Sequence, residues 1–235
     1  MVTEAVAATG RATGKSGGAA GAASKSASKS DASWDEAGAL VRTGQQQRED
    51  GDVDAAAASF TRARSLLEAC FETGSGDALA GSTPLTLSCE YARATYLLAG
   101  AERKRGRVDE AIALYACSVR AFELPDMPAV ASAADSGGGA SLNPKAMSPG
   151  KRRALLASAA NDLGVAHYQR GHLEGALAHF TKAMEVRREV LGVAHPDYAS
   201  SSANVATVLT SLGRSAEAAA IQRSLEHPRA PVTPI

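Results

Sequence analysis

The chain has 235 residues, with 25 basic and 25 acidic side chains and a formal net charge of zero. A neutral chain gives no general electrostatic reason to bind nucleic acid or a membrane surface. No apolar run reaches the roughly 18 residues of a membrane span. The three cysteines are odd in number and lack metal-ligand spacing, which indicates buried thiols in a reducing compartment, the cytoplasm.

The start of the chain, residues 1–33, is predicted to form a disordered tail. Residues 1–30 consist mostly of Gly, Ala, Ser and Lys and contain a single acid, Glu4. Such a composition buries too little apolar surface to offset the entropy of ordering. A basic, Ser-rich, acid-poor start is also typical of organellar transit peptides. A transit peptide is therefore the alternative interpretation of this segment, and a flexible tail is the favoured one.

Four sets of small residues with the same internal spacing come next along the chain. In each set a small residue precedes a glycine by seven positions, and an alanine follows that glycine by five. The sets are Gly44/Gly51/Ala56, Ala99/Gly106/Ala111, Gly164/Gly171/Ala176 and Ala206/Gly213/Ala218. The middle glycine suits a turn with positive φ, and the small residues allow two helices to cross closely. Four sets in register predict a repeated helical hairpin.

A large side chain stands four residues after the last alanine in the first three sets, and a small residue follows three positions later. These residues are Phe60, Tyr115 and Phe180, followed by Ala63, Ser118 and Ala183. The pattern resembles the tetratricopeptide repeat, a helix–turn–helix unit. Departures from the repeat are Gln222 at the fourth aromatic position and the replacement of the consensus Trp by Leu40, Thr95, Ala160 and Ser202.

The corner after the third set indicates a subtype of this repeat. The run from Arg187 to Gly192, followed by His195-Pro196-Asp197-Tyr198, is similar to the kinesin light chain form, in which the second helix and the whole unit are longer. One such longer unit separates Gly171 from Gly213. The resemblance implies an all-α, right-handed α-α superhelix (solenoid) of four hairpins within residues 34–228. The hairpins are expected at about 37–73, 88–124, 152–192 and 197–227.

The earlier turn glycines are further apart than Gly171 and Gly213, which predicts insertions between repeats. Residues 73–84 and 125–149 are rich in small and turn-forming residues and are predicted to be flexible insertions. Residues 229–235 form a Pro-rich tail that cannot continue a helix. The apolar face of the last hairpin needs a cover, and a partner, self-association through the C-terminal repeat or a further continuation stay open as alternatives.

The resemblance also implies a binding surface, because the first helices of such repeats line a concave groove. The peptide-binding residues expected in this groove are Arg48, Arg93, Tyr96, Arg103, Lys104, Asn161, Tyr168 and Asn204. Arg and Tyr are frequent binding anchors, and Asn can hold an extended backbone. The alternative is that Arg103, Lys104 and their basic neighbours are solvent-exposed charges at the end of a helix, where cations complement the helix dipole.

The sequence contains no recognisable enzyme signature. No nucleophile is paired with a base in a known context, and His167, His172 and His179 around one turn lack a Cys or carboxylate to complete a metal site. No catalytic residue, metal or cofactor is therefore expected. The hypothesis is a non-catalytic scaffold that binds a protein segment, with an acidic segment favoured by the basic stretch. The alternative is an RNA-binding helical repeat protein, against which the neutral charge counts.

Overall fold

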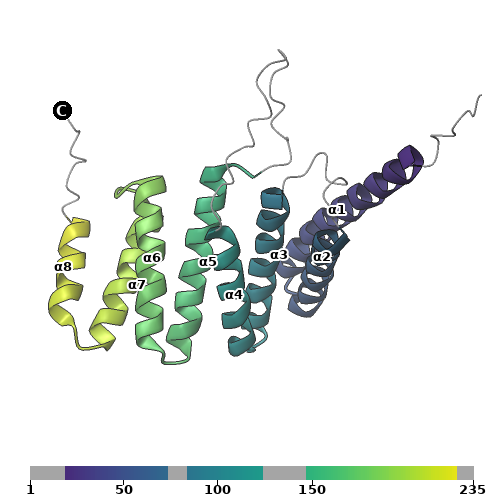
Figure 1. The fold of residues 1–235 in the computed structure, drawn as a ribbon. Coiled ribbons are helices and arrows are strands. Elements are labelled where there is room, and N and C mark those ends of the chain that lie inside the picture. The colour runs from purple at the N-terminus through teal and green to yellow at the C-terminus, as the bar shows by residue number, and fades with distance from the viewer. Residues whose placement is uncertain (1–18, 74–83, 124–146, 227–235) are drawn as a thin grey trace, which may run out of the picture.

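The computed structural model describes residues 19–73, 84–123 and 147–226, which contain α-helices and no strand (Figure 1). The helices, in chain order, are α1 (Ala19–Glu49), α2 (Val53–Thr73), α3 (Pro84–Lys104), α4 (Val108–Glu123), α5 (Pro149–Gln169), α6 (Leu173–Leu191), α7 (Pro196–Ser211) and α8 (Ser215–Glu226).

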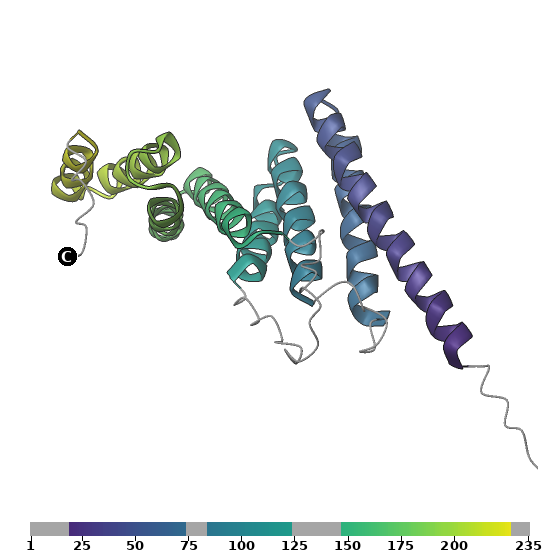
Figure 2. The same ribbon diagram turned by 90° about the horizontal axis from the view of Figure 1, so that it is seen from above.

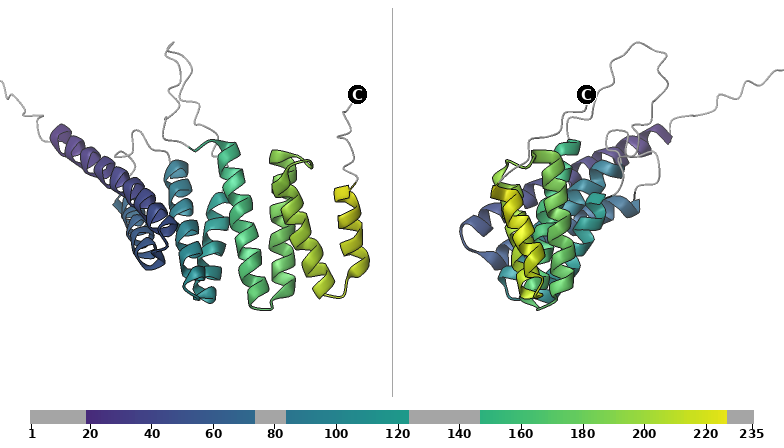
Figure 3. Two further views of the ribbon diagram at one scale, coloured as in Figure 1. Left: turned by 180° about the vertical axis from the view of Figure 1, so that it is seen from behind. Right: turned by 90° about the vertical axis from the view of Figure 1, so that its left-hand side faces the viewer.

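The described helices pair into four hairpins, which lie side by side in one extended row (Figures 1 and 2). Each helix packs against the next one in the chain, and α3 also packs against α5. Viewed from behind and along the row, the hairpins remain stacked one after another without closing into a compact globule (Figure 3). The predicted all-α solenoid of four hairpins is therefore confirmed.

The four turns share one hydrogen-bonded geometry that depends on glycine. Gly51, Gly106, Gly171 and Gly213 have φ values of 88°, 81°, 75° and 76°, a region that costs glycine little and other residues more. The residue after each glycine donates its N–H to the carbonyl five positions earlier, as in the 2.8 Å bond from Asp52 to Gln47. This is the Schellman pattern, which satisfies the last carbonyls of a helix.

Each hairpin is held at its crossing by the small residues that define the repeat. Gly44 and Gly164 are buried, and a Cβ added to either would lie 2.6 or 2.8 Å from a ring carbon of Phe60 or Phe180. The second hairpin uses Ala99 and Tyr115, which share one buried cluster. In the fourth hairpin the aromatic position is the exposed Gln222, so this crossing lacks its ring.

Apolar side chains gather into three clusters rather than one core. The first joins the α1–α2 hairpin to α3, the second joins α3 and α4 to α5 and α6, and the third joins α5 and α6 to α7 and α8. Each cluster therefore joins one hairpin to its neighbour. Contacts confined to neighbours are what a solenoid requires, because one hairpin alone buries too little surface.

The structure differs from the sequence prediction at the start of the chain. α1 begins at Ala19, inside the stretch of residues 1–33 predicted to be a disordered tail. Alanine has the highest intrinsic helix propensity, and the Ala-rich residues before Trp34 continue the first helix of the repeat. Residues 1–18 and 227–235 lie outside the described residues, as does most of both predicted insertions, at 74–83 and 124–146.

The corner between the third and fourth hairpins has the predicted form. α6 ends at Leu191, Gly192 follows with φ 84°, and Pro196 occupies the first turn of α7. His195 caps α7, because its Nδ1 accepts a 3.1 Å hydrogen bond from the N–H of Asp197. The His-Pro-Asp run thus starts a helix, as Pro at the first helical position usually does.

Substituting Gly164 by Ala tests the crossing contact. The new methyl would lie 2.8 Å from Cδ1 of Phe180, whose ring is buried, and we expect the free energy of unfolding to drop by about 1–3 kcal/mol. Gly150→Ala in the same helix is the matched control, because nothing lies within 4 Å of its added Cβ. Urea unfolding of the two variants should separate them, and equal midpoints would contradict the close-packing argument.

Candidate protein-binding groove

The first helices α1, α3, α5 and α7 line one face, here termed the first-helix face, and hydrogen bonds join α3 to α5 and α5 to α7. Tyr96 of α3 donates a 2.9 Å hydrogen bond from its hydroxyl to Oδ2 of Asp162 on α5. One unit further on, Nδ2 of Asn204 on α7 donates a 3.0 Å hydrogen bond to Oδ1 of Asn161 on α5. Tyr96 and Asn161 occupy the same position of their own units. Each contacts, in the following unit, the residue that lies one position further along the repeat.

The corresponding junction between α1 and α3 is apolar and more open. Val41 and Leu97, which occupy these positions, are buried in the first cluster. Beside them lies a groove of about 420 Å³ between α1 and α3, with α2 behind it, lined by Trp34, Asp35, Ala37, Gly38, Val41, Arg42, Leu67, Glu90 and Arg93. This volume falls within the range of ligand-binding pockets in proteins.

The groove has an apolar floor and a charged rim. Ala37, Val41 and Leu67 are almost fully buried beneath it, and Trp34 is half-buried at one side. At the rim, Nη1 of Arg93 lies 3.4 Å from Oε2 of Glu90, and the exposed Arg42 makes no ion pair with a described residue. An apolar floor with a few oriented polar groups is the usual composition of a binding site.

A second feature of the first-helix face is a polar cluster nearer the turns. The rings of Tyr96 and Tyr115 lie 5.9 Å apart, and the charges of Arg48, Arg103 and Asp162 act on the Tyr115 hydroxyl. Burial raises the pKa of Tyr96 and of Tyr115 above the ordinary value, and the negative charge of Asp162 raises both further. Both phenols therefore stay protonated and act as neutral hydrogen-bonding groups.

Arg103 is held in place by this cluster. Its Nε is shielded from solvent and makes no hydrogen bond of good geometry within the described residues, and the same holds for the Tyr115 hydroxyl beside it. Burial, the largest single influence, lowers the pKa of Arg103, but the adjacent phenols and Asp162 together outweigh burial and raise it. The guanidinium is consequently always charged and is fixed by packing rather than by an ion pair.

The residues expected to bind a peptide occupy three different environments. Tyr96 and Arg103 belong to the polar cluster, on whose phenols the charge of Arg48 also acts, and Arg93 lines the α1–α3 groove next to Glu90. Asn161 and Asn204 are bonded to each other, which leaves Nδ2 of the first and Oδ1 of the second for another group. Lys104 is exposed at the end of α3, and Tyr168 is 41% exposed at the end of α5.

Sequence reasoning missed the groove residues Trp34, Gly38, Arg42 and Leu67, and also Asp162 as the partner of Tyr96. Trp34 lies before the first position of the repeat, so the resemblance assigned it no role. The signal available in the sequence was that Trp34 is the single tryptophan of the chain. Leu67 belongs to a second helix and reaches the groove only because α1 and α3 are not packed tightly together.

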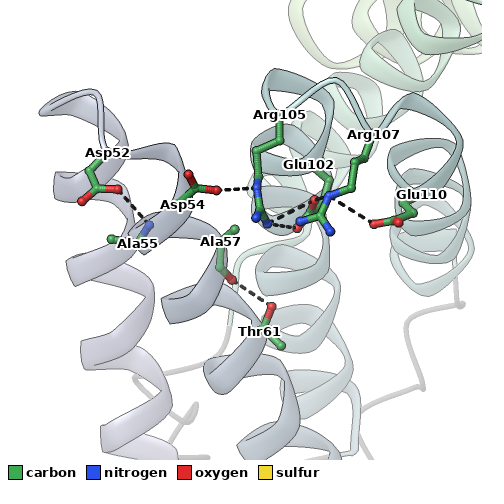
Figure 4. Close-up of polar contacts among 9 residues, drawn as sticks. All are labelled: Asp52, Asp54, Ala55, Ala57, Thr61, Glu102, Arg105, Arg107 and Glu110. Atoms are coloured by element: carbon green, nitrogen blue, oxygen red, sulfur yellow. Dashed lines mark hydrogen bonds and ion pairs between the residues drawn. The ribbon is translucent and has the colours of Figure 1, made fainter.

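Two arginines of the basic stretch are used within the solenoid (Figure 4). Glu102 is only 6% exposed and binds Arg105 at 3.1 Å and Arg107 at 2.5 Å. Arg105 also reaches back to Oδ1 of Asp54 at 2.6 Å, which ties the second hairpin to the first. These cations therefore stabilise a junction between hairpins.

The tie between turns recurs in register at the next junction. Arg170, which precedes Gly171 as Arg105 precedes Gly106, donates a 2.6 Å hydrogen bond from Nε to Asp109. The fourth hairpin has Leu212 at this position, facing Glu174 of the third in the repeat register. The first two junctions thus carry an arginine–carboxylate tie that the third junction cannot form.

The three histidines at the third turn pack on one another. The rings of His167 and His179 are stacked 5.3 Å apart, and those of His167 and His172 lie 5.8 Å apart. Burial, and secondarily the neighbouring imidazole, lowers the pKa of His167 and His179. Among the described residues, no group of three His, Cys, Asp or Glu has the arrangement of a metal site.

Within the described helices, none combines the length and the hydropathy needed to cross a membrane. Cys70, Cys89 and Cys117 form no disulfide in the part of the chain that the structure describes.

This geometry, a row of helical hairpins with turn glycines and ring-on-glycine crossings, defines a helical-repeat solenoid. The sequence model of the tetratricopeptide repeat family matches residues 156–197, which form α5, α6 and the following corner. No curated protein sequence matches the chain.

Two solved structures share the fold. The first is a Podosopora anserina protein described as a kinesin light chain with nearly identical TPR-like repeats, 14% identical, with a TM-score of 0.54 over 83% of this chain and 76% of that one. A point variant of that protein matches at 15% identity with a TM-score of 0.53 over the same shares. Residues 156–197 therefore match the sequence pattern of a tetratricopeptide repeat, and the described hairpins share the fold of these two repeat solenoids.

Removing one arginine of the Glu102 network should cost more than removing an arginine from a surface pair. For Arg107→Met we expect a loss of about 1–3 kcal/mol in unfolding free energy, since the buried Glu102 loses a charged donor. Arg62→Met is the control: it breaks the 2.9 Å pair with Glu36, whose side chains are 68% and 46% exposed, and should cost about 0–1 kcal/mol. If chemical unfolding gave equal losses of unfolding free energy for the two variants, the buried Glu102 network would be no more stabilising than a surface ion pair.

The histidines predict a pH dependence of stability. Because folding lowers the pKa of His167 and His179, the unfolded chain binds more protons below its own histidine pKa of about 6.5, and stability falls as the pH decreases through that value. Urea unfolding at about pH 7.5 and about pH 5.5 measures the loss. A His167→Gln/His179→Gln variant should lose less on acidification, and an undiminished loss would exclude these imidazoles as its source.

Proposed function

We propose that the chain is a non-catalytic scaffold that binds a segment of another protein on its first-helix face, with the α1–α3 groove as the main contact. One observation carries the proposal: a groove of about 420 Å³ with a buried apolar floor and a charged rim. The fold supports it, because solenoids of helical repeats present extended binding surfaces. The groove also offers Trp and Arg side chains, the residue types most often found at binding hot spots.

The RNA-binding alternative gains no support from these contacts. That hypothesis needs the basic stretch to be free for phosphates, because phosphate contacts supply most of the affinity for nucleic acid. Arg105 and Arg107 are instead bound to Glu102, and Arg105 also to Asp54. A titration with single-stranded RNA should show weak binding, and tight, strongly salt-dependent binding would favour RNA over protein.

A cytoplasmic location belongs to the same proposal. Cys70 is buried and Cys117 is half-buried, and neither forms a disulfide with a described residue. Cysteines outside disulfides are typical of reducing compartments. Self-association through the C-terminal repeat stays a prediction. Ile221 and Leu225 of α8 are only half-buried, and the exposed Gln222 lies between them.

Filling the groove tests the proposal directly. Gly38 lies at its edge, and an added Cβ would be no closer than 3.7 Å to the nearest side chain, the flexible Arg42. Peptides would be selected from a displayed library on the full chain, resynthesised and titrated against Gly38→Trp. We expect binding to weaken by about tenfold or more, the equivalent of about 1.4 kcal/mol for one lost anchor.

The control for this experiment is Ala58→Trp, which places the same side chain at an exposed position of α2. It should leave the affinity unchanged, and both variants should keep the helical circular dichroism of the parent. If no peptide is enriched, or if the selected peptides bind Gly38→Trp as tightly as the parent, the groove is not the binding site.

A further inference from the structure

A short motif at the start of α5 has the pattern of a phosphorylation site. The chain contains three pairs in which proline follows a serine or threonine, namely Thr83-Pro84, Ser148-Pro149 and Thr233-Pro234. In one of them a basic residue stands two positions after the proline, which gives the run Ser148-Pro149-Gly150-Lys151. Proline-directed protein kinases select this pattern, because proline brings no N–H that needs an acceptor in the kinase and the basic residue pairs with an anionic group of the kinase.

The order of these residues, and not the start of a helix alone, distinguishes Ser148. Two other helices of the solenoid, α3 and α7, also begin at a proline. The residue before α7 is His195, which has no hydroxyl, and α3 has Thr86 at the position that corresponds to Lys151. The complete motif therefore occurs once in the sequence.

The motif is accessible at the surface. Its four residues, Ser148 to Lys151, are all exposed, and nothing in the described structure lies within 4 Å of a Cβ added to Gly150. Ser148 has an extended backbone, with φ −62° and ψ 146°. Its Oγ accepts a 3.3 Å hydrogen bond from the N–H of Lys151, which is longer than the usual N–H···O distance. A kinase can therefore reach the hydroxyl without displacing a packed side chain.

A kinase that binds the motif in extended form has to unwind only the first turn of α5. Glycine at position 150 lowers the stability of this turn, and the ends of helices open at little cost in free energy. The first buried side chain of α5 is that of Arg152. Unwinding as far as Lys151 therefore leaves the packed part of the helix in place.

The charges at the start of α5 favour a phosphate on Ser148. The first turn of α5 contains no acidic residue, whereas Lys151, Arg152 and Arg153 follow one another in the sequence. These cations lie at the end of the helix where the dipole favours negative charge. A phosphoserine carries a charge of about −1.5 to −2 at neutral pH and can accept hydrogen bonds from the N–H groups of the first turn. It would therefore supply the negative charge that this helix start lacks.

We propose that Ser148 is the acceptor of a proline-directed protein kinase and that its phosphate then caps α5. In the reaction the Oγ of Ser148 attacks the γ-phosphorus of the ATP that the kinase holds, and a bond forms between these two atoms. The bond from that phosphorus to the oxygen bridging the β- and γ-phosphates breaks, and ADP leaves with its electron pair. The hydroxyl proton passes to the catalytic aspartate of the kinase. This modification site is independent of the α1–α3 groove.

The first experiment incubates the full chain with ATP, Mg²⁺ and a cyclin-dependent kinase, which is proline-directed, and maps the phosphate by mass spectrometry. We expect Ser148 to be modified at least about tenfold faster than Thr83 or Thr233, which lack the basic residue. Lys151→Gln should slow the modification by about tenfold, as for one lost charge-assisted contact. Arg188→Gln, which removes an exposed charge of α6, should not slow it.

Two results would contradict the assignment of the acceptor: modification of Thr83 or Thr233 as fast as that of Ser148, or an unchanged rate for Lys151→Gln. The variants should keep the helical circular dichroism of the parent, so that a slower reaction is not due to misfolding. Ser148→Ala should lose the phosphate, which identifies the site. The protein isolated from its own cells should carry the phosphate on Ser148, and its absence at every growth stage would equally overturn the assignment.

Phosphorus NMR tests the cap. The second pKa of phosphoserine is about 6 in an unstructured chain, and it should be measured in the folded phosphorylated chain and in the same chain unfolded by urea. Because the positive end of the α5 dipole favours the dianion, the phosphate of the folded chain should titrate about half a pH unit lower. Equal titration in both states would show that the phosphate does not cap α5 and would refute that half of the proposal.

Discussion

The contact on which the solenoid depends is the one between an aromatic ring and a small residue where the two helices of a hairpin cross. With glycine at the crossing, the rings of Phe60 and Phe180 lie where a methyl group would otherwise be. This close approach lets a short glycine turn join the helices, and it sets the angle at which each hairpin meets its neighbour. The row of first helices, and with it any binding surface, follows from that geometry.

The second hairpin shows how a change in this contact creates a new property. Tyr115 replaces Phe at the ring position, and its hydroxyl extends beyond the crossing to the first-helix face under Gly100. There the Tyr115 hydroxyl lies beside the guanidinium of Arg103 and does not neutralise its charge. A residue whose first role is packing thus places a buried polar atom beneath the first-helix face.

The sequence predicted the hairpins well because their signal is local. Turn glycines, small crossing residues and the ring position all fall within one repeat, and the buried positions of Ala56, Ala111 and Ala176 match it. The groove was harder to predict, because Trp34 and Leu67 line it together with residues of α3, which requires the placement of α3 beside the first hairpin to be known. The pairing of Arg105 with Asp54 in the preceding hairpin likewise needs the stacking of hairpins to be known. The start of α1 was missed since composition alone cannot show that an Ala-rich stretch extends a helix anchored further on.

Because position 212 is a leucine, the last hairpin of the solenoid is attached less firmly than the others. Two junctions are clamped at their turns by arginine, while the last hairpin is attached by side-chain packing, the amide pair Asn161–Asn204, and the hydrogen bonds of Arg187 to Ser201 and to the carbonyl of Asp197. Its own crossing also lacks a ring. Cooperative opening should accordingly begin at the α7–α8 end, so that the hairpins that form the proposed α1–α3 groove stay closed when the last hairpin opens.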